Sequence, residues 1–233
     1  MITECILLCG GKGSRLGIEI PKCLVEVAGK TLLEWRIDYF RKNGVRHSIL
    51  AIGHYGDQVI KFENDKFREL NVSFSIEDAN NLLGTGGAIN HAFTFIKDSK
   101  AYVSNCDDIT FPDLENLPDE NLMLLTNMRS PFGVIDFKKN TIKQEKGKVS
   151  SYEIEKFIEK PLLEDTYVSC GFYILDKKCE FPVKGSIEQD CFMNEEWRKK
   201  NSLRCVIHRG IWATVNTQKD IAESEKLLKE ISN

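Results

Sequence analysis

The apolar positions at the start of the chain change from a continuous run to a helical pattern. Residues 2–9 are almost all apolar and are followed by a pair of glycines, which predicts a buried strand that leads into a glycine-rich loop. Residues 31–43 place apolar side chains at helical spacing. Thr31 with Glu34 three residues later predicts a capping box at the start of this helix.

Strand and helix patterns keep alternating along the rest of the chain. Further strands are predicted at 48–52, 72–76, 101–104, 122–126, 133–137 and 168–175, and further helices at 57–67, 86–96 and 220–231. Residues 138–151 are polar and rich in lysine, which predicts a solvated loop. The alternation predicts an α/β fold: a single Rossmann-like domain over 1–233, with a largely parallel central sheet flanked by helices.

Composition and charge narrow the class of protein. With 233 residues and 42% apolar positions, the chain is long enough for one full core. Its net charge of -3 gives no overall basic field, so we expect neither nucleic acid nor a membrane surface as a partner. The first apolar run is too short for a membrane span and lacks the basic flank of a signal peptide, so we expect a soluble, cytoplasmic protein.

The eight cysteines show no Cys-x-x-Cys pair and no zinc-finger spacing. In a protein without a secretory signal, they are expected to be reduced thiols that pack as small apolar side chains.

The loop over residues 8–22 carries the features of a phosphate site. Glycines allow the backbone to approach a ligand closely and leave amide groups free to point at phosphate oxygens. The residues expected to bind nucleotide in this way are Leu8, Gly10, Gly11, Gly13 and Ser14. Arg15 adds a planar fork for phosphate, and Lys22, after the rigid Pro21, adds a point charge. These features predict a triphosphate site.

Two common phosphate-binding motifs are excluded by spacing. No Gly-x-x-x-x-Gly-Lys-Ser/Thr sequence is present, which argues against a Walker-type NTPase. Leu16 occupies the position of the third glycine in a Gly-x-Gly-x-x-Gly motif, which argues against a dinucleotide oxidoreductase.

The loop and five further motifs together resemble the sugar-1-phosphate nucleotidyltransferases, a family with a Rossmann-like fold of the GT-A type. The first motif is similar to the family's Ala-Gly-Gly-x-Gly-Thr-Arg-Leu, with a later Pro-Lys. The others follow in the family's order: Leu-Gly-Thr-Gly-Gly-Ala at 83–88, Asn-Cys-Asp at 105–107, Phe-Ile-Glu-Lys-Pro at 157–161, Ser-Cys-Gly-Phe-Tyr at 169–173 and Val-Asn-Thr at 215–217. The resemblance spans essentially the whole chain.

The resemblance implies in-line attack of a sugar-phosphate oxygen on the α-phosphorus of a nucleoside triphosphate, with pyrophosphate leaving. Arg15, Lys22 and Asp107 are then the expected catalytic residues. Asp107 is also the expected Mg²⁺ ligand, since the family carries its metal on the aspartate of Asn-Gly-Asp. Asp108 is expected to support it or to be a solvated acid at the strand end.

The resemblance also implies where each substrate binds. Gly84 and Thr85 are expected to contact the base or ribose, and Thr85 also to cap the following helix; Glu77 and Asn81 are further candidates. The Gly-Thr-Gly-Gly-Ala sequence is most similar to guanylyltransferases acting on mannose or heptose 1-phosphate. Cytidylyl, uridylyl and thymidylyl transfer remain alternatives.

The sugar 1-phosphate is expected to contact Glu159, Lys160 and Gly171. An acid within 186–190 is a weaker candidate, and a solvated helix start explains that segment as well. A homodimer is the default expectation for an enzyme of this size.

The chain departs from the family where relatives carry a second metal-binding aspartate. Asn216 or Thr214 stands at that position, depending on the alignment, and the amide oxygen of Asn216 is a Mg²⁺ ligand without charge. This opens an alternative from another class, a regulatory subunit that binds nucleotide without turnover. A glycosyltransferase is disfavoured because its Asp-x-Asp motif is missing.

Four cysteines also depart from the family pattern, at positions where relatives carry alanine, proline or glycine: Cys9, Cys23, Cys106 and Cys170. Small size explains them. The sharper hypothesis is that oxidation or alkylation of Cys9 or Cys106 alters activity.

Overall fold

The computed structural model describes residues 2–11, 13, 16–17, 19–67, 69–143 and 151–231. The chain forms two compact units, the first made of residues 1–124 and 169–233 and the second of residues 125–168. The expected organisation as one domain over 1–233 stays a prediction.

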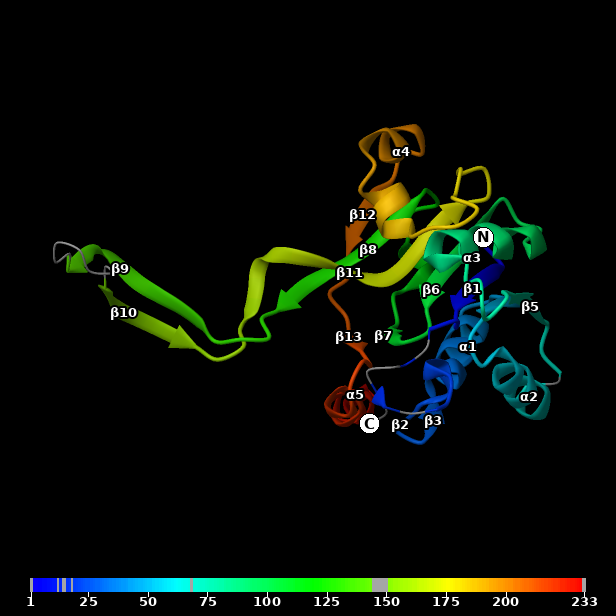
Figure 1. Cartoon of the computed structure of the whole chain (residues 1–233), viewed down its shortest axis with the longest axis horizontal. Helices are drawn as coiled ribbons and strands as arrows, with labels where there is room; N and C mark the ends of the chain where they lie inside the picture. Colours follow the sequence, from blue (N-terminus) through cyan, green and yellow to red (C-terminus); the bar gives the residue numbers. More distant parts are fainter. Residues whose placement is uncertain are drawn as a thin grey trace. The chain divides into compact units, whose positions relative to one another are not determined.

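A seven-stranded sheet forms the centre of the first unit, in the order β12-β8-β11-β6-β1-β4-β5 (Figure 1). In chain order its strands are β1 (Glu4–Leu8), β4 (His47–Ile52), β5 (Val72–Ile76), β6 (Lys100–Asn105), β8 (Leu122–Arg129), β11 (Leu162–Asp176) and β12 (Arg204–Ile207). Strands β6, β1, β4 and β5 pair in parallel, and β11 pairs with β6 antiparallel. The expected α/β fold with a mostly parallel sheet is confirmed.

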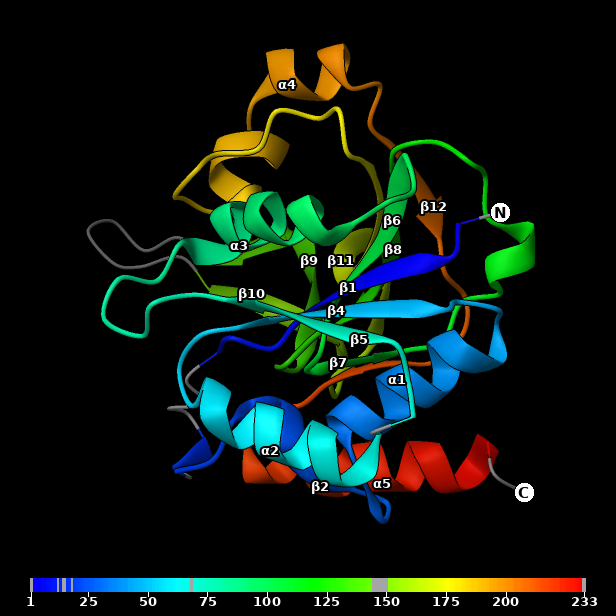
Figure 2. The ribbon, with the colours of Figure 1, turned by 90° about the vertical axis from the view of Figure 1, so that its right-hand side faces the viewer.

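Helices cover both faces of this sheet, as Figure 2 shows. One face carries α3 (Gly84–Ala92) and α4 (Glu195–Lys200), and the other carries α1 (Leu32–Lys42), α2 (Gly56–Lys66) and α5 (Gln218–Ile231). Shorter elements are η2 (Lys22–Leu24), η3 (Phe93–Phe95), η4 (Leu114–Asn116) and η5 (Ile187–Phe192), and the strand pairs β2 (Glu26–Val27) with β3 (Lys30–Thr31) and β7 (Asp108–Thr110) with β13 (Trp212–Thr214).

The apolar run of β1 is explained by burial on both faces of the sheet. Alternate side chains of a strand point to opposite faces. Cys5 and Leu7 pack with the α1 side, whereas Ile6 packs with the α3 side, and all three are fully buried. Because its parallel neighbours β4 and β6 hold it in place, β1 delivers the following glycines to the carboxyl edge of the sheet.

The predicted capping box at the start of α1 is confirmed. The Thr31 hydroxyl accepts a hydrogen bond from the Glu34 amide at 3.1 Å, and the Glu34 carboxylate accepts one from the Thr31 amide at 2.7 Å. The helix ends at Lys42, with Asn43 as its C-terminal cap.

The second unit contains a hairpin that the sequence pattern does not predict. Strand β9 (Val134–Lys143) pairs antiparallel with β10 (Ser151–Ile158) (Figure 1). The expected solvated loop over 138–151 is therefore wrong for 138–143 and for Ser151, and residues 144–150 lie outside the described residues. A two-stranded ribbon has no buried face, so its strands need no apolar alternation. Cross-strand charges occur instead, such as Lys138 with Glu153 at 2.8 Å.

The capping box gives a pH-dependent prediction. Burial alone raises the pKa of Glu34, but hydrogen bonds from Thr31 and the charge of Lys66 outweigh it and lower the pKa. A lowered pKa in the folded state stabilises the fold above the unfolded pKa, and this contribution is lost as pH falls through the folded value. Glu34→Gln should therefore reduce the free energy of unfolding at pH 7 by about 0.5 kcal/mol and have no effect at pH 2.5, measured by urea unfolding. Glu69→Gln, at an exposed position, is the control; an effect of Glu34→Gln that persists at pH 2.5 would contradict the assignment.

Candidate functional site

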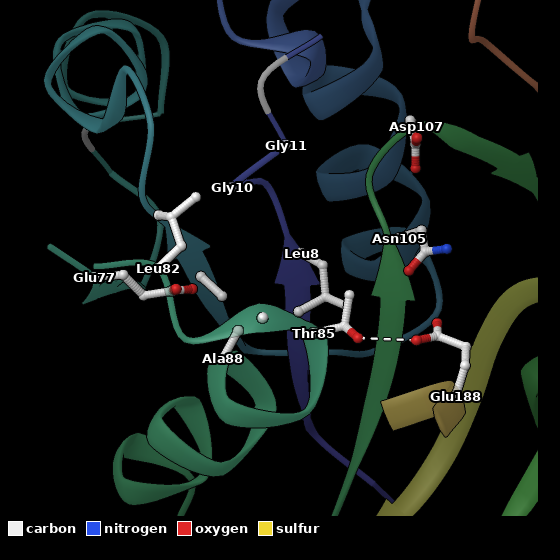
Figure 3. Close-up of a pocket in the computed structure, with 12 residues that line it drawn as sticks. Leu8, Gly10, Gly11, Glu77, Leu82, Thr85, Ala88, Asn105, Asp107 and Glu188 are labelled. Carbon is white, nitrogen blue, oxygen red and sulfur yellow. Dashed lines mark hydrogen bonds between the residues drawn. The ribbon is translucent and has the colours of Figure 1, made fainter. Parts of the chain in front are cut away.

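A pocket of about 290 Å³ lies at the carboxyl edge of the parallel strands (Figure 3). The residues that line it are Leu8, Gly10, Gly11, Ala51, Glu77, Leu82, Gly84, Thr85, Ala88, Asn105, Asp107 and Glu188. They come from the ends of β1, β4 and β6, from the segment after β5, and from α3 and η5. Open α/β sheets bind their ligands at this edge, beyond the carboxyl ends of the strands.

The glycine-rich loop forms one wall of this pocket. Leu8, Gly10 and Gly11 line it as expected, and a side chain added to Gly11 would meet no atom within 4 Å. Gly13 adopts a left-handed conformation with φ of 62° and lies against the Lys22 side chain. Ser14 and Arg15 lie outside the described residues, so their assigned roles stay predictions.

Three residues far apart in the sequence meet at the edge of this pocket. The Lys22 ammonium donates hydrogen bonds to the Asp107 carboxylate and to the Asn216 amide oxygen, the latter at 2.6 Å. The side chain of Lys22 is 12% exposed and that of Asp107 is 31% exposed, so the ion pair is partly withdrawn from water. A single cation is thus held by two oxygen acceptors beside the pocket.

The backbone around Asn216 fixes this arrangement. The Val215 amide donates to the Asp107 carbonyl at 3.0 Å. The Asp220 carboxylate accepts from the amides of Asn216 and Thr217 at 2.8 and 2.7 Å. The start of α5 is therefore tied to the turn that carries Asp107.

The neighbouring acid, Asp108, faces the interior and is only 7% exposed, so it is not a solvated acid at the strand end. Burial, followed by the nearby Asp107 charge, raises the pKa of Asp108 to about 6. Its carboxylate accepts a hydrogen bond from the Asn105 side chain at 2.9 Å. Asp107 and Asp108 are thus adjacent in sequence but lie in opposite environments.

Gly171 packs against the side chains of Asp108 and Asn105. It has φ of 65°, and an added Cβ would lie 2.1 Å from the Asp108 carboxylate and 2.6 Å from the Asn105 amide nitrogen. Gly171 therefore makes room for Asp108 and Asn105, a reason for glycine that the sequence analysis did not identify. Its expected contact with a sugar stays a prediction.

A buried arginine that the sequence analysis missed supports the same turn. Arg36 of α1 is 1% exposed, and its guanidinium donates to the Ser104 hydroxyl at 2.5 Å and to the Thr110 carbonyl. It also lies 5.2 Å from the Phe40 ring and 5.8 Å from the Phe172 ring. Arg36 thereby links β6, the strand before Asp107, to β7, the strand that begins at Asp108.

Gly84 and Thr85 line the pocket as expected, but Thr85 does not cap the helix. Helix α3 begins at Gly84, and Leu83 is its N-terminal cap. The Thr85 hydroxyl instead donates to the Glu188 carboxylate at 3.0 Å and accepts from the Ile187 amide at 3.0 Å (Figure 3). Tertiary contacts with η5 take the hydroxyl away from the helix terminus.

Two acids complete the pocket. Glu77 was a weaker candidate from the sequence; its carboxylate accepts from the Leu83 amide at 2.7 Å. Glu188 lies in a segment for which the sequence favours a solvated helix start over a ligand contact. Ser186 does cap η5, yet Glu188 lines the pocket. Asn81 does not line it and accepts a hydrogen bond from Lys184 at 2.5 Å.

The two remaining sequence candidates belong to the second unit. Glu159 is exposed, and Lys160 has a left-handed backbone with φ of 46°. The Lys160 carbonyl accepts a hydrogen bond from Arg129 at 3.1 Å. Their expected contact with the sugar phosphate stays a prediction.

The fold and the pocket define an α/β protein with a ligand site at the carboxyl edge of a parallel sheet. The sequence model of the Nucleotidyl transferase family matches residues 4–229, and the chain belongs to this family. The resemblance inferred from the motifs is therefore confirmed. Within the described residues, no helix has the length and apolar character that crossing a membrane requires.

Named relatives and solved structures agree with this assignment. The chain is 28% identical over 213 residues to a D-glycero-alpha-D-manno-heptose 1-phosphate guanylyltransferase of Campylobacter jejuni, covering 87% of this chain and 90% of that protein. It is 25% identical to mannose-1-phosphate guanyltransferase beta-A of Xenopus laevis, covering 93% of this chain but 62% of that protein. The crystal structure of HddC from Yersinia pseudotuberculosis has the same fold, with a TM-score of 0.72 at 24% identity and coverage of 97% and 99% of the two chains.

The contact at Gly171 yields a prediction with a matched control. Gly29 also has a left-handed backbone, with φ of 80°, but a Cβ there would meet no atom within 4 Å. Gly29→Ala should cost about 1 kcal/mol of stability from backbone strain alone. Gly171→Ala should cost at least about 2 kcal/mol more, because it also collides with Asp108 and Asn105. Urea unfolding of both variants measures the difference, and equal losses would show that Gly171 is there only for its backbone.

Proposed function

We propose that this chain transfers a nucleotidyl group from a nucleoside triphosphate to a sugar 1-phosphate, with release of pyrophosphate. The observation that carries the proposal is the Lys22 ammonium held between Asp107 and Asn216 at the edge of a pocket lined by the glycine-rich loop. A positive charge and two cation-binding oxygens therefore lie beside the wall that would hold a triphosphate. Family membership supports the reaction class.

In the proposed reaction a phosphate oxygen of the sugar 1-phosphate attacks the α-phosphorus of the triphosphate. A new oxygen–phosphorus bond forms, the bond from the α-phosphorus to the β-phosphate oxygen breaks, and pyrophosphate carries away the electron pair. No covalent intermediate on the protein is needed, because alignment and charge neutralisation supply the rate enhancement. Lys22 neutralises the phosphate at the reacting centre, and Arg15 binds the departing pyrophosphate.

We propose Mg²⁺ as the cofactor, held by Asp107 and Asn216. The side-chain oxygens of these two residues already converge on one cationic atom, the Lys22 nitrogen. An all-oxygen ligand set suits a hard divalent cation. When bound, the ion supplies further neutralisation of phosphate charge. With one carboxylate and one amide, the protein contributes a single negative charge, so substrate phosphates have to complete the site.

We propose guanine as the base. Guanine presents two neighbouring N–H donor groups, and Glu77 in the pocket wall is a carboxylate that only accepts. One oxygen of the Glu77 carboxylate accepts from the Leu83 amide, and the other lies toward Gly10, on the side of the glycine-rich loop. The guanylyltransferase names of the Campylobacter and Xenopus relatives favour the same base, as does a second HddC crystal structure, which is a complex with GMP-PN.

For the second substrate we propose mannose- or heptose-type 1-phosphates, by similarity to what the relatives' names state. Glu159, Lys160 and Gly171 are the residues proposed to contact it. We further propose that the protein is cytoplasmic and acts as a homodimer.

A regulatory subunit without turnover is the second candidate function. Asn216 favours it, because an amide replaces the charge that a second aspartate would bring to the metal. The two candidates make different predictions for product formation but the same prediction for nucleotide binding.

An assay of pyrophosphate release across five triphosphates and a panel of sugar 1-phosphates separates them. We expect release with GTP and a mannose- or heptose-type 1-phosphate, dependent on Mg²⁺ and abolished by EDTA. Release with another base would replace the guanylyl assignment. Nucleotide binding by calorimetry without release for any pairing would establish the regulatory alternative.

The metal assignment predicts opposite effects at the two ligands. Asp107→Asn should lower Mg²⁺-dependent turnover on the order of 100-fold, because the only charged ligand is lost. Asn216→Asp should lower the Mg²⁺ concentration needed for half-maximal rate about tenfold, because it adds a charge. Lys61→Ala, exposed on α2, is the control with unchanged turnover. Thermal unfolding checks that each variant is folded, and near-normal turnover of folded Asp107→Asn would refute the assignment.

A further inference from the structure

Three cysteines meet directly behind the Lys22–Asp107 pair. The sulfur atoms of Cys9, Cys23 and Cys106 all lie within 4.8 Å of one another. Their residues are 3%, 1% and 2% exposed, and none of them forms a disulfide. Neither the fold nor the proposed transfer reaction requires three thiols at one point.

The architecture of the sheet explains why they meet. In the parallel pairing of β1 with β6, Leu8 lies opposite Asn105, so the next residues, Cys9 and Cys106, leave the two strands side by side. The Cys106 amide donates to the Leu8 carbonyl at 3.2 Å, which keeps the two chain segments together. Cys23 approaches from η2, the short helix that also carries Lys22.

The geometry is that of a three-sulfur ligand set. A metal–sulfur bond of about 2.3 Å places three sulfurs around one ion on a triangle with edges of about 4.0 Å. The three sulfur atoms lie at most 4.8 Å apart, so small side-chain shifts bring them to this spacing. Thiolate ligands select soft cations such as Cu(I) and Zn(II) over Mg²⁺.

A small cavity lies next to the three sulfurs. It has a volume of about 50 Å³ and is lined by all three cysteines, together with Leu8, Gly11, Lys22 and Asp107. An ion therefore has space beside the sulfurs. The Asp107 carboxylate at its wall is available as a fourth ligand for a tetrahedral ion.

We propose that Cys9, Cys23 and Cys106 form a binding site for one soft, thiophilic cation, and that its occupancy inhibits the neighbouring catalytic site. Cys23 follows Lys22 and Cys106 precedes Asp107 in the sequence, so an ion held by the three sulfurs places its positive charge beside the Lys22–Asp107 ion pair. The ion also competes for the Asp107 carboxylate. The three sulfur ligands are distinct from the oxygen ligands proposed for Mg²⁺, because hard and soft cations select different ligand atoms, and Asp107 is the residue that the two proposed sites share.

Binding is tested on the reduced, whole protein with Cd(II) as the probe, without substrates. We expect an ultraviolet sulfur-to-cadmium absorption band that saturates at one equivalent, and an ion that stays with the protein through gel filtration. X-ray absorption spectroscopy should show three sulfur neighbours. Cu(I), added under anaerobic conditions, should displace Cd(II) and remove its band.

Matched cysteine variants locate the site. Cys23→Ala should weaken Cd(II) binding about 100-fold or more, whereas Cys179→Ala, a buried cysteine elsewhere in the core, should leave it unchanged. Cys205→Ala removes the exposed thiol and tests for adventitious binding. If Cys23→Ala fails to fold, Cys9→Ser and Cys106→Ser serve in its place, with thermal unfolding as the check. The proposal would be overturned if the folded variants of Cys9, Cys23 or Cys106 bound Cd(II) as tightly as the wild type does. Loss of Cd(II) binding in Cys205→Ala would overturn it as well.

The inhibitory effect is read in the pyrophosphate assay. One equivalent of Cd(II) should lower turnover at saturating Mg²⁺ at least tenfold in the wild type and in Cys179→Ala, and added thiol chelator should restore it. Stoichiometric binding with unchanged turnover would retain the site and overturn its coupling. Because the binding experiments need no substrate, failure of the proposed transfer reaction leaves their outcome interpretable.

Discussion

The buried guanidinium of Arg36 holds together the part of the fold that carries the site. It lies in the core among aromatic rings and donates to Ser104 and Thr110, on the strands either side of the Asp107–Asp108 turn. Burying an arginine is costly unless it is hydrogen-bonded, and loss of either partner would leave a charge unsatisfied in the core. The turn is therefore fixed by the same contacts that make the buried charge tolerable, and Asp107 has a defined position before any ligand arrives.

The two aspartates of this turn face different parts of the molecule: Asp107 faces the pocket edge and Asp108 faces the core. Asp107 faces Lys22 at the pocket edge, where its side chain is partly exposed. Asp108 faces Asn105 and Gly171 in the interior, and its raised pKa reflects the cost of a charge there. Asp107 thus presents its charge to a cation at the pocket edge, whereas Asp108 packs against Gly171 in the interior.

The sequence predicts well those elements whose local pattern and tertiary environment agree. The apolar run of β1 and the Thr31–Glu34 capping box have one physical explanation each, and both are confirmed. The glycine-rich loop and the motif containing Gly84 and Thr85 also lie at the pocket as their residue types indicate.

What the sequence does not predict depends on contacts between distant segments. The β9–β10 hairpin has no buried face to leave an apolar pattern, and Thr85 exchanges a capping role for a bond to Glu188. Arg36 looks like any surface arginine until the strands around it are placed. The cysteines at 9, 23 and 106 have no metal-binding spacing along the chain. The parallel register of β1 and β6 brings Cys9 and Cys106 together, and η2 adds Cys23.

Lys22 is distant in the sequence from both of its hydrogen-bond partners, and this distance affects the order in which the chain folds. Asp107 lies 85 residues away from it and Asn216 lies 194 residues away. During synthesis the glycine-rich loop, β1, β4 and β6 can assemble while the ribosome is still translating the last third of the chain. The contact between Lys22 and Asn216 forms only when the segment before α5 docks, and Glu188, which lines the pocket, is also part of the last third of the chain. The pocket and the three-residue contact beside it are therefore among the last parts of the fold to be completed.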